Sequence, residues 1–198
     1  MRRQAKVLSV KPLSKESIEL KVEAFLKRVA PESLRTPQPT PVLKIIDGKL
    51  LDLYGFAFAV RDDLGPKCYG VTDFGEKLVS LSEDVYVALE KDEGRARFTG
   101  AHEGAHVLLH SDELCPISAR FSSGEWIHLH RAVPAEIPVF RDPEWQANHG
   151  AGAILMPREM IRMVAANKSN PIVDVVKTFK VSLQAAEVRL KKLSLIAA

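Results

Sequence analysis

Cysteines and long apolar runs are both scarce in this sequence. Only two cysteines, Cys68 and Cys115, occur among its 198 residues, and neither lies in a CxxC pair. Two are too few for a disulfide scaffold, and we interpret them as ordinary reduced thiols. No segment approaches the roughly 18–20 apolar residues that a membrane span requires, and residues 1–6 lack the apolar stretch of a secretory signal. We therefore expect a cytoplasmic protein without membrane association.

A strong net charge is also absent, because the chain carries only +3. Residues 1–30 and residues 157–198 each carry a net charge of +5, so residues 31–156 carry −7. An acidic middle favours cation binding and disfavours contact with DNA, whereas basic ends are compatible with a nucleic acid or an acidic partner. Solvated helix faces would produce the same counts. With 46% hydrophobic residues, the chain is large enough for one core and one main domain.

The most informative motif is HExxH, which reads His-Glu-Gly-Ala-His at positions 102–106. On a helix, positions four apart lie on one face, so His102 and His106 can present two imidazoles to a single zinc ion. Glu103 points to the side of this pair, where it can accept a proton from a metal-bound water. This layout is typical of zinc metallopeptidases. The alternative is an amphipathic helix in which the two histidines are simply packed.

A catalytic zinc ion needs a third protein ligand as well as an open position for water. The extended motif HExxHxxGxxH is excluded because the chain has Leu109 and Asp112 at the required glycine and histidine positions. His110 lies eight residues from His102 on the same helix, a rise of about 12 Å, which is too far to share one ion. A glutamate from a second helix is the remaining arrangement.

Residues 142–155 provide such a helix. Asp142 suits its N-cap and Pro143 its first helical position, which places Glu144 in the first turn. Asn148, four residues further on, lies on the same face and is positioned to hydrogen-bond a ligand imidazole. From the residues alone, the favoured interpretation of Glu144 is an acid that the helix dipole stabilises, and a metal ligand is the alternative.

Two sequence blocks resemble the ImmA/IrrE family of zinc metallopeptidases. The first block contains the HExxH motif and runs from Phe98 to His110. The second reads Glu-Trp-Gln-Ala-Asn at 144–148 and is followed by Leu-Met-Pro at 155–157. The resemblance extends upstream to the Glu-Asp-Val-Tyr segment at 83–86 and covers roughly residues 40–196. It is therefore much more specific than the pentapeptide alone.

The resemblance implies a site in which zinc is held by His102, His106 and Glu144, with Glu103 as the general base. In the mechanism we expect, zinc lowers the pKa of its water, Glu103 takes the proton, and the resulting hydroxide attacks a peptide carbonyl. The resemblance also implies a regulatory protease that cleaves one protein partner, typically a helix-turn-helix repressor in a bacterial cytoplasm. The sequence itself contains no signal for that partner.

The chain departs from the family pattern after the second block, where it reads His-Gly-Ala-Gly at 149–152. The glycines predict a looser helix, and we interpret His149 as a partly exposed polar residue, with a role at the metal or substrate as the alternative. A transition-state donor is also expected in this class of reaction. His128, His130, Arg131 and His149 are the candidates, although loop histidines need no function, and the sequence does not choose among them.

The pattern of apolar residues, caps and turn residues predicts both helices and short strands. Beyond the two site helices, helices are expected over 14–29, 42–54 and 82–91, and strands over 56–60, 69–71 and 77–81. A hairpin around Asp47-Gly48 is the alternative for 42–54. Gly100 and Gly104 in the HExxH helix suggest a close packing partner. Residues 111–140, which contain Pro116 and Pro134, are predicted to form an irregular loop.

We predict an α+β fold in which a small β-sheet packs against helices that carry a zincin-like active site. Residues 1–156 would form the metallopeptidase domain, and residues 157–198 a C-terminal helical extension of it. Helices over 170–179 and 182–193 resemble a helix-turn-helix, which makes DNA contact possible, but closure of the core is the favoured role. The competing function is a DNA- or protein-binding regulator with a structural or vestigial zinc site. Glu103 favours the enzyme, because a structural site has no use for a base.

Overall fold

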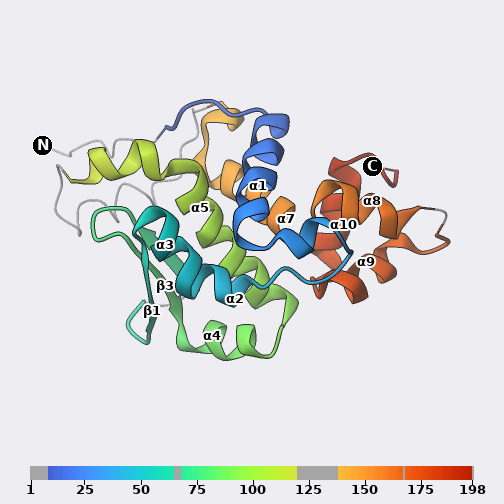
Figure 1. Ribbon diagram of the computed structural model, residues 1–198, viewed down its shortest axis with the longest axis horizontal. Helices are drawn as coiled ribbons and strands as arrows, with labels where there is room; N and C mark the ends of the chain where they lie inside the picture. The colour runs from blue at the N-terminus through green and yellow to red at the C-terminus, as the bar shows by residue number, and fades with distance from the viewer. Residues whose placement is uncertain (1–8, 65–67, 120–137, 167, 198) are drawn as a thin grey trace, which may run out of the picture.

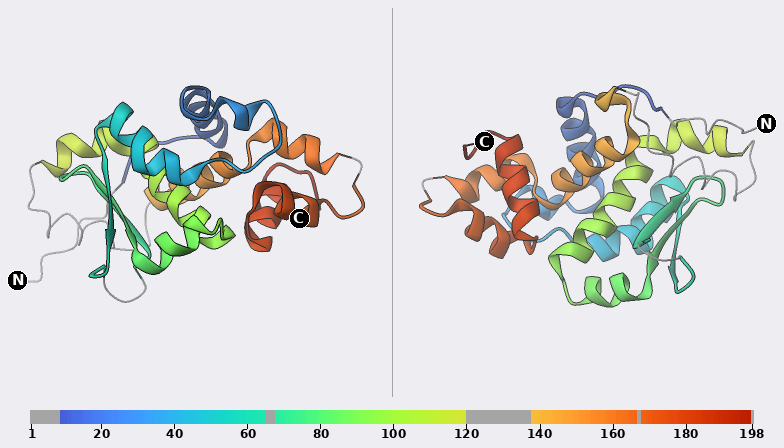
Figure 2. Two further views of the ribbon diagram at one scale, coloured as in Figure 1. Left: turned by 60° about the horizontal axis from the view of Figure 1, so that its bottom comes forward. Right: turned by 180° about the vertical axis from the view of Figure 1, so that it is seen from behind.

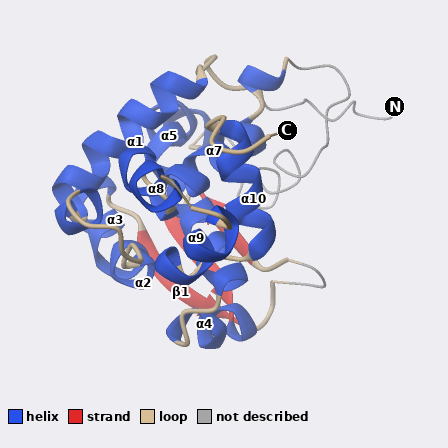
Figure 3. Cartoon of the chain, turned by 90° about the vertical axis from the view of Figure 1, so that its right-hand side faces the viewer, coloured by secondary structure: helices blue, strands red, loops and turns tan. Residues whose placement is uncertain are grey.

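The structure is a computed structural model that describes residues 9–64, 68–119, 138–166 and 168–197. It is an α+β fold, as predicted, in which helices form most of the mass and one small mixed sheet lies among them (Figure 1, Figure 3). The helices are α1 (Lys15–Val29), α2 (Val42–Lys44), α3 (Leu50–Tyr54), α4 (Glu83–Glu90), α5 (Gly94–Ser118), α7 (Pro143–Leu155), α8 (Arg158–Ala165), α9 (Pro171–Phe179) and α10 (Leu183–Lys192). Shorter turns are η1 (Pro31–Leu34), η2 (Ile45–Lys49) and η3 (Val139–Arg141), and the strands are β1 (Ala57–Arg61), β2 (Gly70–Asp73) and β3 (Leu78–Ser82).

The long helix α5 is the central element of the fold. The sheet lies near one of its ends, and α8, α9 and α10 form a group at the other side of the molecule (Figure 1, Figure 2). Helices α1 and α7 both pack against α5 and also against each other. Within the described residues, no helix combines the length and apolarity needed to cross a bilayer.

The sheet has the strand order β1-β3-β2, with β3 parallel to β1 and antiparallel to β2. The strands lie within a residue or two of the predicted positions. Val79 and Leu81 of the central strand are fully buried, which anchors the sheet in the core. Strand β2 is therefore an edge strand, and it packs directly against α5. This contact brings strand residues next to the HExxH helix.

Residues 42–54 are helical, so the hairpin alternative is wrong. The helix contains a π turn, η2, that includes Asp47 and Gly48. Ile45, Ile46 and Leu50 are all buried on one side of it, and this apolar face explains why the segment packs as a helix. Gly55 ends it with a positive φ of 73°, a conformation that glycine adopts without steric cost.

Helix α5 continues further than the sequence predicted. It runs to Ser118 and contains Pro116, so the expectation of an irregular segment from residue 111 is wrong for 111–118. Leu114 and Ser118 are buried, and their packing holds the last turn despite the proline. The rest of the predicted loop, residues 120–137, lies outside the described residues.

Glycines allow α5 to pack closely against its neighbours. A Cβ placed on Gly100 would lie 2.9 Å from Cγ1 of Val42, which confirms the predicted close packing there. At Gly104 the nearest atom would be 3.8 Å away, an ordinary contact, so that part of the prediction is wrong. A Cβ on Gly150 of α7 would lie 2.9 Å from Cβ of Ala105, so α5 and α7 approach closely at this point. A Cβ on Gly152 would be 3.6 Å from Cδ of Arg189, an ordinary contact, so Gly150 is the glycine of α7 that serves tight packing rather than the looseness we expected.

The C-terminal helices begin at the predicted caps. The Asn170 side chain accepts a hydrogen bond from the Val173 N–H at 3.4 Å, and the Ser182 hydroxyl accepts one from the Ala185 N–H at 3.1 Å. The buried guanidinium of Arg189 on α10 donates to the Met156 carbonyl at the end of α7. It also forms a bidentate ion pair with Glu19 of α1. Helix α10 is thus tied to the body of the fold by buried polar contacts.

Candidate metal centre

The three predicted zinc ligands converge in the structure. His102 and His106 lie on one face of α5, and Glu144 reaches them from the first turn of α7. Their ligand atoms all lie within 4.8 Å of one another. The helix that carries Glu144 begins as predicted, because the Asp142 side chain accepts a hydrogen bond from the Glu144 N–H at 2.9 Å. Pro143 then occupies the first helical position.

The spacing of these atoms fits a tetrahedral zinc ion. The two Nε2 atoms are 3.0 Å apart, His102 Nε2 lies 3.2 Å from Glu144 Oε2, and His106 Nε2 lies 3.2 Å from Glu144 Oε1. Ligands about 2.0–2.1 Å from a tetrahedral ion are separated by about 3.3 Å. Two imidazoles and a carboxylate are also the donor set of many catalytic zinc sites. The residues present therefore fit the ion that the motif implies.

A chain of buried hydrogen bonds fixes the orientation of His106. The side-chain amide of Gln146 donates to the carbonyls of Lys11 and Phe140, at 2.9 and 2.8 Å, so its oxygen must face His110. His110 Nε2 therefore donates to that oxygen at 3.0 Å, and His110 Nδ1 accepts from His106 Nδ1 at 3.2 Å. This direction of donation leaves Nε2 of His106 with its lone pair toward Glu144, as a metal ligand requires.

The protonation of His106 and Glu144 agrees with this arrangement. Burial lowers the pKa of His106 to about 3, so its imidazole is neutral at physiological pH. Burial would raise the pKa of the Glu144 carboxyl, but its contacts with His102 and His106 outweigh burial and hold that pKa well below its usual range. A neutral imidazole and a carboxylate are the forms that bind zinc.

The sequence excluded His110 as a ligand on distance, and the structure gives it another role as the partner that orients His106. Its replacement by alanine should weaken zinc binding by about 10–100-fold, the usual cost of losing such a partner. A competition titration against a fluorescent zinc chelator measures this change. Ser111→Ala, at a neighbouring buried position outside the hydrogen-bond chain, is the control. Unchanged zinc affinity in a folded His110→Ala protein would contradict this role.

Glu103 lies beside the cluster, buried between α5 and the edge strand β2. Its Oε2 accepts a hydrogen bond from the Thr72 hydroxyl at 2.7 Å, and a Cβ on Gly70 would approach its Oε1 to 3.0 Å. Burial raises the pKa of the Glu103 carboxyl, which makes its carboxylate a stronger base. Sequence reasoning missed Thr72 and Gly70, because only the packing of β2 on α5 brings them to this position.

Two further polar residues of α7 were considered from the sequence. Glu144, Glu103 and the nearby Asn148 side chain together raise the pKa of His102 despite its burial. His149 is not a partly exposed residue, because its side chain is only 2% exposed and its Nε2 lies 3.1 Å from Glu19 Oε1. It faces α1 because α7 packs against that helix. The candidate donors His128, His130 and Arg131 lie outside the described residues.

Comparison with known proteins supports part of this assignment. The family model Peptidase_M78, described as IrrE N-terminal-like domain, matches residues 139–191, which include Glu144 and Asn148 but not the HExxH segment. A solved structure, named as a Mycobacterium tuberculosis transcriptional regulator, aligns with a TM-score of 0.56 and 16% identity over 89% of this chain. That likeness concerns the fold alone, and this chain spans 46% of that protein's length. No match was found among curated proteins.

Proposed function

We propose that the protein is a zinc-dependent endopeptidase. The observation that carries the proposal is the position of Glu103, a buried carboxylate held by Thr72 directly beside three convergent ligand side chains. A purely structural zinc site has no need of such a base. The match of residues 139–191 to a metallopeptidase family supports the same reaction class.

When bound by His102, His106 and Glu144, zinc would supply Lewis acidity that polarises a carbonyl and lowers the pKa of water. Thr72 donates a hydrogen bond to Oε2 of Glu103 and so holds in place the carboxylate that accepts a proton from the attacking water. The same carboxyl then donates that proton to the departing amine, as a general acid. The chain Gln146–His110–His106 keeps the His106 imidazole in the required orientation throughout.

A regulatory role in the cytoplasm is the biological setting we propose, with a helix-turn-helix repressor as the substrate. The support is the resemblance of both blocks to the ImmA/IrrE peptidases and the partial family match. A regulator without peptidase activity is the second candidate, and it is favoured by the likeness in fold to a protein named as a transcriptional regulator. The two candidates differ in whether a protein partner is cut or only bound.

Removal of the metal tests the proposed function directly. We expect the purified protein to contain one zinc per chain by mass spectrometry of the metal, because the site offers one set of three ligands. It should cleave a helix-turn-helix repressor encoded in a neighbouring gene. A chelator should abolish cleavage, and added zinc should restore it.

Two controls separate the candidate functions. A mutant with alanine at both His102 and His106 should lack zinc and activity while it remains folded. An intact repressor after incubation with the zinc-loaded protein, together with a DNA mobility shift that weakens at higher salt, would instead favour the regulator.

A further inference from the structure

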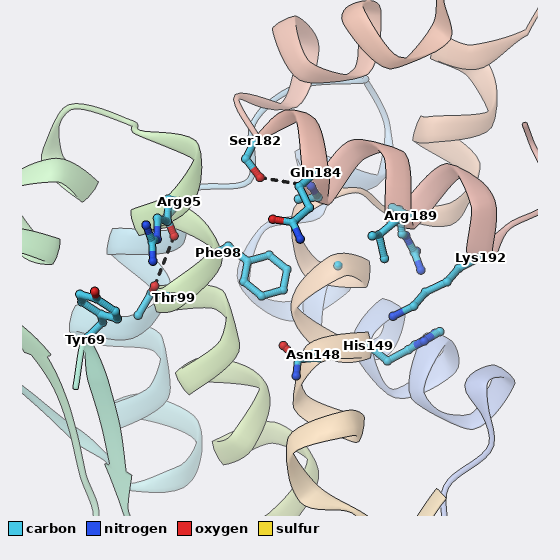
Figure 4. A pocket seen from close by; sticks show the side chains of 13 residues that line it. Tyr69, Arg95, Phe98, Thr99, Asn148, His149, Ser182, Gln184, Arg189 and Lys192 are labelled. Carbon is cyan, nitrogen blue, oxygen red and sulfur yellow. Dashed lines mark hydrogen bonds between the residues drawn. The ribbon is translucent and has the colours of Figure 1, made fainter. Parts of the chain in front are cut away.

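A cavity of about 730 Å³ lies between α5, α7 and α10, beside the candidate metal centre. Figure 4 shows Phe98 of α5 at its middle, with Asn148 of α7 on one side and Gln184 of α10 on the other. The remaining wall is completed by apolar side chains of α10, including Val188, and by Tyr69 before β2. Helix α10, the second helix of the pair that resembles a helix-turn-helix, is thus one wall of this cavity.

The cavity and the metal centre share two helices. Phe98 lies one helical turn before His102 on α5, and Asn148 lies one turn after Glu144 on α7. Asn148 lines the cavity and also lies close enough to His102 to influence its pKa. A peptide bound at the metal would therefore place its neighbouring residues against this cavity.

The described lining contains three cations, Arg95, Arg189 and Lys192, and no carboxylate. The charge of Arg189 is already compensated, because its guanidinium forms a bidentate ion pair with Glu19. Arg95 lies over the Tyr69 ring at 5.3 Å, and within the described part of the chain no acidic residue lies in ion-pair distance of Arg95 or Lys192. The cavity therefore carries uncompensated positive charge.

Lys192 is the second cation of the described lining without an ion-pair partner, and it lies at the α10 side of the cavity. Figure 4 shows its side chain extending from α10 toward His149 of α7. Its side chain is exposed, and partial desolvation together with the nearby charges of Arg189 and Lys15 lowers its pKa, although Glu19 acts in the opposite direction. An anion beside Lys192 would offset the repulsion from the two neighbouring cations.

We propose that this cavity is a specificity site that binds an acidic side chain of the peptide substrate, flanked by apolar residues. This inference rests on the proposed function, because it assigns a substrate class to the same site. The cations attract a carboxylate, and Phe98 and Val188 offer apolar surface to its neighbours. A DNA backbone is a poorer occupant, because phosphate binding uses rows of cations, whereas apolar side chains separate Arg95 from Lys192 in this lining.

Binding of matched peptides tests this inference independently of cleavage. The protein is the full chain, zinc-loaded, with Glu103→Gln so that peptides stay intact. The probes are fluorescent peptides based on the repressor sequence, identical except for one position that is Asp, Ala or Lys. Fluorescence anisotropy should show the Asp peptide binding about tenfold more tightly than the Ala peptide, with the Lys peptide weakest.

Charge reversal should remove this preference. Lys192→Glu should abolish the tighter binding of the Asp peptide and favour the Lys peptide. Arg95→Glu, at an exposed position of the lining, should also reduce the preference for the Asp peptide. Lys191→Glu, at the next residue of α10 but outside the cavity lining, should leave the preference unchanged. Thermal unfolding of each variant confirms that the fold is intact.

Equal binding of the Asp and Ala peptides, or a preference that neither reversal changes, would overturn the inference. Competition by a DNA duplex that Lys192→Glu abolishes would also overturn it, because the cations would then serve phosphates. Failure of the wild-type protein to cleave any repressor contradicts the proposed function instead, and that result comes from a separate measurement.

Discussion

Replacement of Glu103 by glutamine should reduce repressor cleavage by about 10²–10⁴-fold, the range expected for loss of a general acid–base group. Glutamine keeps the shape of the side chain and can still accept the hydrogen bond from the Thr72 hydroxyl. It cannot accept the proton of the attacking water. Zinc binding should stay unchanged, because Glu103 lies outside the three-residue cluster. Single-turnover kinetics and a zinc titration on the same preparation measure both quantities.

A glutamate-to-glutamine substitution at another position of α5 is the control for Glu103→Gln. Glu113 accepts a hydrogen bond from the Lys11 N–H and does not belong to the metal-ligand cluster, so Glu113→Gln should cleave at close to the wild-type rate. Full activity of Glu103→Gln would refute the proposed role of this residue. Loss of zinc from that variant would mean that Glu103 supports the metal rather than the proton transfer.

Replacement of Glu19 by leucine should lower the free energy of unfolding by about 3–5 kcal/mol, the cost of breaking a buried ion pair from one side. The carboxylate of Glu19 is paired with Arg189 and hydrogen-bonded by His149, and all three side chains are less than 10% exposed. The substitution leaves the Arg189 charge buried without its partner. This loss is a large share of the roughly 5–15 kcal/mol that stabilises a typical domain. Denaturant unfolding followed by circular dichroism measures it.

The double mutant Glu19→Leu with Arg189→Met is the critical comparison. It replaces both charges by apolar groups of similar size, so most of the lost stability should return. A double mutant that is no more stable than the single Glu19→Leu variant would show that the charges themselves are not the source of the loss.

The pH dependence of the free energy of unfolding should reveal the titration of Glu19. Burial alone would raise the pKa of Glu19, but hydrogen bonds from Arg189 and His149 outweigh it and lower the pKa to about 2, from a usual value of 4.5. A carboxyl with a lowered pKa in the folded state stabilises the fold above its unfolded pKa. That contribution should be lost as the pH falls from about 4.5 to about 2, and Glu19→Leu should lack this part of the acid transition.

The parts of the site that depend on local sequence were predictable. His102 and His106 are fixed by helical periodicity, and Glu144 by the cap that starts α7, so their elements could be placed before the structure was known. Their convergence depended on the packing of α7 on α5, for which only the family resemblance gave a reason. The role of Thr72 as the hydrogen-bond donor to Glu103 could not be predicted. The two residues are about thirty positions apart in the sequence, and the local sequence around Thr72 does not indicate that β2 packs against α5.

The errors have a common physical cause. We predicted that His149 is partly exposed and that the glycines after it loosen the helix. Both predictions considered only the residue type and not the helices that pack against α7. In the structure α7 is covered by α1 and α5, so His149 is buried and Gly150 sits at a helix crossing. The extension of α5 past Pro116 has the same explanation, since burial of Leu114 and Ser118 overrides local propensity.

The hydrogen-bond chain that orients His106 runs through His110 and Gln146 and ends at the carbonyl of Lys11. Lys11 and His106 are far apart in the sequence. The segment that precedes α1 is thus linked by hydrogen bonds to the imidazole of a candidate metal ligand. A chain in which this segment has not docked should therefore hold a metal ion at this site less tightly than the complete fold does.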